Sequence, residues 1–223
     1  STLRQDPPAP KPKPAPERKV TPVPSFDIPR AAAPIAIDGN LSADDWFGLD
    51  PARGVTLKQG VYGEDCKFAT RAWMAWDDEA LYVAFDNAVD PELEMTLGDA
   101  WGGSDAVELA LSNPSAGDKP PIIVLRGFAA GKFYSSDEAG APAAVVSRAG
   151  EGVQYAAKVV DKGRWVCELR VPFSSLGIDP NADLRYPCNL SVRKMGEEAW
   201  VMWRGTGGCT WVVSEAGFVR FAR

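Results

Sequence analysis

Hydrophobic and polar residues alternate with a period of two through most of the chain. In TRAWMAW, residues 70–76, we expect Ala72, Met74 and Trp76 to share one face and Arg71 to lie on the other. Such alternation is typical of strands that are buried on one face. The same pattern predicts further strands over residues 80–87, 105–111, 121–128, 153–160, 164–173, 188–194, 199–205 and 217–223. With turn residues between the runs, it predicts an all-β fold, a two-sheet antiparallel β-sandwich of jelly-roll-like type.

Helical signals are confined to single turns. Ser42 stands three residues before Asp45, the spacing of a capping box, which predicts one turn within LSADDW. PFSSLGI predicts another short turn that ends at Gly177. The polar residues 77–79 separate two alternating runs and predict a hairpin turn.

The first 34 residues differ in composition from the rest. They hold ten of the nineteen prolines, six Lys or Arg and three Asp or Glu, and so carry a charge of about +3. We therefore divide the chain into a proline-rich extended arm, residues 1–34, and a body, residues 35–223. Proline-rich polar segments bury little apolar area, so we expect residues 1–30 to have almost no regular secondary structure and few contacts with the body.

Charge and residue counts exclude several classes of protein. The chain has a net charge of −6, which leaves the body at about −9, so binding to nucleic acid is disfavoured. No apolar run approaches the length of a membrane span. The chain has no histidine, which excludes Ser-His-Asp and Cys-His catalysis and histidine-ligated zinc or haem. It begins Ser-Thr-Leu, as a processed or trimmed chain does.

The four cysteines leave two alternatives open, namely buried free thiols or one or two disulfides. Cys167 has the strand parity of Trp165, and Cys188 has that of Leu190, so we expect both thiols to face the core. If a disulfide forms, a bond between Cys167 and Cys188 is the pairing that we favour.

The run WRGTGGCTWVV, residues 203–213, raises a question about its glycines. It lacks the Lys-Ser/Thr pair of a phosphate-binding P-loop, and residues 211–213 are predicted to form a strand or its edge. The glycines must therefore serve another purpose than cradling a phosphate.

Several motifs occur together in an order that is similar to a known family. IAIDGNLSADDW, AWMAWDDEALYVAFDNAVDP, WGGSDAVELAL, WVCELRVPFSSLGI, CNLSVRK and TWVVSEAGFVRF follow one another along residues 35–223. This order resembles the family 9 carbohydrate-binding modules and related sandwiches. The resemblance implies a sugar clamped between Trp101 and Trp211, with Arg126 contacting its hydroxyl groups. The small glycine residues would then keep the loop from covering Trp211, so that the face of its indole ring is exposed.

The sequence also departs from that family. Amide side chains that the family places beside the clamp are replaced here by Ser191, Arg193 and glycines. Arg193 and Arg204 are candidate substitutes, and guanidinium groups would suit an acidic or sulfated sugar. The resemblance further implies a structural calcium ion held by Asp38 and Asp90.

Two functions therefore compete. The first is an extracytoplasmic (secreted, periplasmic or cell-surface), non-catalytic carbohydrate-binding module. The second is a structural or assembly subunit whose arm docks on a larger protein complex and whose sugar site is degenerate. Two weaker alternatives are methionine-ligated haem, with Met74, Met95, Met195 and Met202 as candidates, and a glycosidase built on the acid pairs at residues 77–78 and 197–198.

Overall fold

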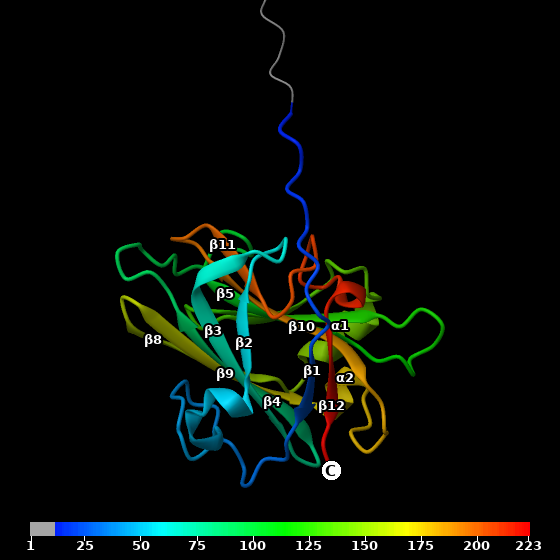
Figure 1. Ribbon diagram of the computed structural model, residues 1–223. Coiled ribbons are helices and arrows are strands. Elements are labelled where there is room, and N and C mark those ends of the chain that lie inside the picture. The colour runs from blue at the N-terminus through cyan, green and yellow to red at the C-terminus, as the bar shows by residue number, and fades with distance from the viewer. Residues whose placement is uncertain (1–11) are drawn as a thin grey trace, which may run out of the picture.

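The computed structural model describes residues 12–223 and confirms the all-β prediction (Figure 1). The strands are β1 (Ser25–Ile28), β2 (Val55–Gln59), β3 (Asp65–Trp76), β4 (Ala80–Ala88), β5 (Ala106–Ser112), β6 (Ile122–Phe128), β7 (Phe133–Ser136), β8 (Gln154–Asp161), β9 (Arg164–Pro172), β10 (Tyr186–Lys194), β11 (Ala199–Met202) and β12 (Gly217–Phe221). The helices are α1 (Ala143–Gly150) and α2 (Phe173–Leu176), with 3-10 turns η1 (Phe47–Leu49), η2 (Pro51–Arg53) and η3 (Val213–Glu215).

The strands form two layers that are joined at one side. Hydrogen-bonded neighbours follow the order β7-β6-β5-β10-β11-β2-β3-β4-β9-β8, and β12 pairs with β10 and with β1. Between β11 and β2 the ladder consists of the single pair Met202 and Gln59, so this narrow contact links the two halves. All neighbouring strands run antiparallel except β1 and β12, which are parallel.

Alternate residues of both layers fill one core. Met74 of β3, Phe85 of β4, Leu109 of β5 and Leu190 of β10 are all buried in the same cluster. This arrangement is the one that the period-two pattern predicts for facing sheets. A smaller cluster covers the opposite side of β3 and β4, where Trp46 packs beside Trp73.

The arm is more closely attached to the body than its composition predicts. The prediction of few contacts is wrong over residues 18–30, while residues 1–11 lie outside the described part of the chain. Strand β1 pairs with β12, and the side chain of Ile28 is fully buried. The physical reason is that SFDI carries an apolar residue at every second position, which overrides the effect of the prolines on either side.

Other local predictions have mixed outcomes. Helix α2 ends at Gly177 in the left-handed conformation, as expected, whereas α1 was not predicted. Residues 211–213 form no strand; they run from a turn into η3, so that prediction is wrong. No helix within residues 12–223 is long and apolar enough to cross a membrane.

All four cysteines are free, so the structure does not contain the favoured disulfide. Cys167 and Cys188 are both buried in the core, as their strand parity predicts. Burial raises the pKa of each thiol, so the two behave as small apolar groups. Cys66 is half-buried and Cys209 is exposed.

Candidate functional site

A row of side chains crosses the outer face of one layer. Direct cross-strand pairs connect Tyr134 of β7, Arg126 of β6, Glu108 of β5, Ser191 of β10 and Met202 of β11. They share a face because residues of the opposite parity, such as Leu109, point into the core. The outward-facing positions of these strands thus carry a strip of mostly charged and polar side chains. From the alternation of hydrophobic and polar residues, this face is expected to contact solvent.

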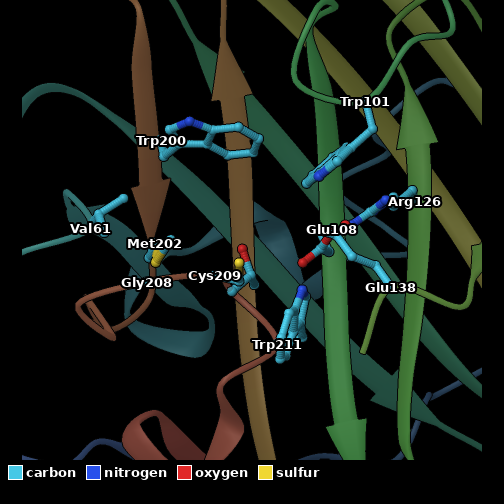
Figure 2. A pocket seen from close by; sticks show the side chains of 11 residues that line it. Val61, Trp101, Glu108, Arg126, Glu138, Trp200, Met202, Gly208, Cys209 and Trp211 are labelled. Carbon is cyan, nitrogen blue, oxygen red and sulfur yellow. The ribbon is translucent and has the colours of Figure 1, made fainter. Parts of the chain in front are cut away.

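Arg126, Glu108 and Met202 of this strip line a cavity of about 360 Å³. Three tryptophans line it: Trp101 from the loop before β5, Trp200 from β11 and Trp211 from the loop before β12 (Figure 2). Met202, Cys209 and Val61 complete the apolar part of the lining. The ring centroids of Trp101 and Trp200 lie 5.1 Å apart with an interplanar angle of 58°. Both tryptophans predicted from the family resemblance therefore face one cavity, and a third joins them.

Arg126 lies at the centre of the charged groups in this cavity. Its Nε donates to Glu108 Oε2 at 2.6 Å, and its Nη2 donates to Glu138. Its guanidinium carbon also stands 4.1 Å from the centroid of the Trp101 ring, within the range of a cation–π contact. These contacts orient both the arginine and one face of the Trp101 indole.

The carboxyl group of Glu108 is strongly affected by its surroundings. Burial raises its pKa to about 7, although the charge of Arg126 opposes that rise. Burial lowers the pKa of Arg126, but Glu108 and the hydrogen bond to Glu138 outweigh that effect and leave it above its ordinary value. The site therefore holds one guanidinium that stays charged and two carboxyl groups, of which Glu108 titrates near neutrality.

The glycine run is explained by close packing. A Cβ on Gly205 would lie 2.3 Å from the carbonyl oxygen of Gly60, and Gly207 has a φ of +80°. Neither position accepts a larger residue without strain. Asn189 holds the same loop to the sheet, since its amide donates to the carbonyl oxygens of Arg204 and Thr210 at 3.1 and 3.3 Å. The glycines thus let the loop pack against the turn at residues 60–63, while Trp211 at its end stays partly exposed.

The two other predicted arginines stand outside the cavity lining. The guanidinium carbon of Arg193 lies 4.9 Å from the centroid of the Trp200 ring, so this residue contacts the site only through that indole. Arg204 is buried, and it donates to the carbonyl oxygens of Glu215 and Thr21 at 2.7 and 2.6 Å. Its contacts anchor the arm, so it does not replace the family's amide groups.

Each of the two aspartates proposed for calcium shapes a turn of its own. Asp38 Oδ1 accepts from the backbone of Asn40, and Asp90 Oδ1 accepts from that of Glu92, as aspartates in turns commonly do. Within residues 12–223 no three Asp, Glu or Cys side chains gather as a metal-binding group. The calcium ion that the family resemblance implies at Asp38 and Asp90 stays a prediction.

The ammonium group of Lys194 is buried against β3 and β4. Lys194 Nζ donates to the carbonyl oxygens of Phe68 and Ala88 at 2.8 and 2.6 Å. Burial lowers the pKa of this lysine to about 8.

Two of the methionines proposed as haem ligands, and one of the acids proposed for a glycosidase, make contacts that stabilise the fold. Met74 is buried in the core, and Met202 is buried with one side on the cavity. The Asp77 carboxylate accepts from Glu79 N, Ala80 N and the Tyr82 hydroxyl, and thereby shapes the predicted hairpin turn.

Three site residues were missed by the sequence reasoning, namely Trp200, Glu108 and Glu138. The sequence did contain a signal for Trp200, because residues two apart on a strand point to the same face. Trp200 and Met202 therefore place two large apolar side chains on one face of a short strand. Glu108 also stood out as a charge between apolar neighbours. Glu138 lies in a loop, where no periodicity marks it.

Comparisons with known proteins place this geometry in context. No family model and no curated protein sequence matches the chain. A family 9 carbohydrate-binding module from Caldicellulosiruptor kristjanssonii, solved with cellotriose, superposes with a TM-score of 0.64 at 18% identity. That match covers 89% of this chain and 93% of the other. A structure of a family 9 carbohydrate-binding module from the same organism, solved with glucose, gives a TM-score of 0.64 at 17% identity. That match covers 88% of this chain and 95% of the other. The chain therefore has a fold similar to that of the family 9 carbohydrate-binding modules.

Proposed function

We propose that this protein is a non-catalytic, extracytoplasmic carbohydrate-binding module and that the cavity between Trp101, Trp200 and Trp211 is its sugar site. The observation that carries the proposal is the convergence of three indoles from separate segments over one charged strip. Solved structures of the same fold hold cellotriose and glucose, which supports a sugar as the ligand.

The lining suits the two kinds of surface that a sugar presents. The C–H faces of a pyranose ring pack on aromatic planes, and its hydroxyl groups need directional partners. Glu108 and Glu138 supply acceptors, and the guanidinium of Arg126 supplies donors beside Trp101. A cavity of about 360 Å³ is within the size range of ligand pockets.

The charges of the site favour an uncharged glycan. Two carboxyl groups accompany one guanidinium, and Arg193 and Arg204 do not line the cavity. An acidic or sulfated sugar would place its charge near the carboxyl group of Glu138 and, above about pH 7, near an ionised Glu108. That arrangement costs free energy by like-charge repulsion. We therefore assign a neutral sugar, in place of the acidic sugar that the arginines suggest from sequence alone.

The assembly subunit is the second candidate. It is favoured by the exposure of all six residues 12–17, which include three prolines and stand clear of the sandwich. Proline-rich segments of this kind are common ligands of other protein domains.

A glycan array tests the proposal. We expect the wild-type protein to bind neutral oligosaccharides, and Trp101→Ala to lose that binding because the platform and its Arg126 contact are gone. Phe218→Ala is the matched control, since Arg185 stands 4.4 Å from its ring in the same kind of contact away from the cavity. Binding confined to acidic glycans would contradict the assigned ligand. If no glycan binds, the assembly role is the better explanation.

A further inference from the structure

The segment 18–21 of the arm contacts the two loops that build one wall of the cavity, although none of the arm residues 12–34 that the structure describes lines the cavity itself. Arg18 Nε and Nη2 both donate to the carbonyl oxygen of Gly205, at 3.2 and 2.9 Å. Arg18 Nη1 donates to Glu215 Oε2 at 2.7 Å. One partly buried guanidinium is thus bonded both to the glycine-rich run that carries Trp211, at Gly205, and to η3, which follows that run.

The neighbouring arm residues hold the second loop. Lys19 N donates to the carbonyl oxygen of Tyr62 at 2.8 Å. Gly63 leaves room for this contact, because a Cβ there would lie 2.2 Å from the carbonyl oxygen of Lys19. The arm therefore fixes the turn that presents Val61 to the cavity.

The two loops are also bonded to each other. Gly207 N donates to the carbonyl oxygen of Val61 at 2.7 Å, and Gly205 N donates to Gln59 Oε1 at 3.0 Å. The same Gln59 oxygen accepts from the Thr21 hydroxyl at 3.1 Å. Arm, turn and glycine loop thus form one hydrogen-bonded unit, with the arm on its outer side and the cavity on its inner side.

We propose that the arm is a brace for the cavity and that Arg18 is a positioning residue for the sugar site. This inference rests on the proposed function in one respect, namely that the occupant is a sugar. Two sites linked through one rigid unit are coupled in free energy, and the coupling is reciprocal. Occupation of the cavity should therefore strengthen attachment of the arm, and loss of the Arg18 contacts should weaken binding in the cavity.

Hydrogen exchange and sugar binding on Arg18→Ala test the brace in the full chain. Arg220→Ala is the matched control, because it removes another ion pair between arm and body, Arg220–Asp27 at 3.0 Å, on β1 and β12. We expect amide exchange of residues 203–213 to rise about fivefold in Arg18→Ala, at the low end of known coupling strengths. We expect the affinity for the array-selected sugar to fall by a similar factor, and Arg220→Ala to change neither.

Peptides from β4 and β9 separate a local brace from general destabilisation. Their exchange should be unchanged in Arg18→Ala, since Arg18 is partly exposed and contributes little to global stability. Unchanged exchange over residues 203–213 would overturn the brace. So would raised exchange with an unaltered sugar affinity. If the wild-type protein binds no sugar, the proposed function fails by itself, and the exchange data still decide whether the arm holds the loop.

Discussion

Replacing Ile28 by alanine tests whether the arm is part of the folded unit. Ile28 is fully buried in the main core cluster and stands opposite Phe221 across the parallel pair of β1 and β12. The substitution removes three carbon atoms, which at about 0.8 kcal/mol each corresponds to about 2.4 kcal/mol of lost burial. The cavity that remains adds to this loss, so we expect the free energy of unfolding to fall by about 3 kcal/mol.

Urea unfolding followed by tryptophan fluorescence measures this loss. Val20→Ala is the matched control, because Val20 belongs to the same arm but is 73% exposed, and its replacement should cost less than about 0.5 kcal/mol. The midpoint for Ile28→Ala should shift at constant slope. A loss below about 1 kcal/mol would refute the reasoning and would mean that β1 is only loosely attached to β12.

Two further predictions concern the cavity. Because burial raises the pKa of Glu108 to about 7, the folded state holds a proton that the unfolded state releases near pH 4.5. Stability should therefore fall as pH rises from about 4.5 to 7, by up to about 3 kcal/mol, and Glu108→Gln should remove that part of the slope in urea titrations; equal slopes in the two proteins would contradict the assignment. The exposed thiol of Cys209 lines the cavity, so a saturating array-selected glycan should slow its alkylation at pH 8.5 at least fivefold, as an order-of-magnitude expectation for a covered group. The half-buried Cys66, which does not line this cavity, should keep its rate in the same mass spectra, and equal protection of both thiols would argue against a local effect.

The all-β class could be predicted because the two layers bury alternate residues. Met74 and Phe85 follow that rule, and Cys167 and Cys188 were placed in the core by parity alone. Strand β1 was missed because a short SFDI run among prolines carries a weak signal, and its stability comes from pairing with β12 at the other end of the chain. The amino-acid composition of a segment is an average, so the proline-rich composition of the arm gave no indication that Ile28 is buried.

The site could be predicted only in part. Trp101 and Trp211 were found through the family resemblance, and they do line one cavity. Arg193 and Arg204 were candidates there because guanidinium groups suit an acidic or sulfated sugar, yet hydrogen bonds to the backbone direct Arg204 toward the arm. The row of Arg126, Glu108 and Ser191 depends on strand register, which alternation along a single strand does not specify.

Calorimetric titration of Trp211→Ala with the array-selected glycan tests the central claim most directly. Trp211 is only partly buried, and it forms one wall of the cavity. We predict that the affinity falls at least tenfold, as is typical when an aromatic anchor is truncated, while the free energy of unfolding changes by less than about 1 kcal/mol. An unchanged affinity, together with a loss of the roughly 3–5 kcal/mol expected of a core aromatic, would contradict the account and make Trp211 a packing residue.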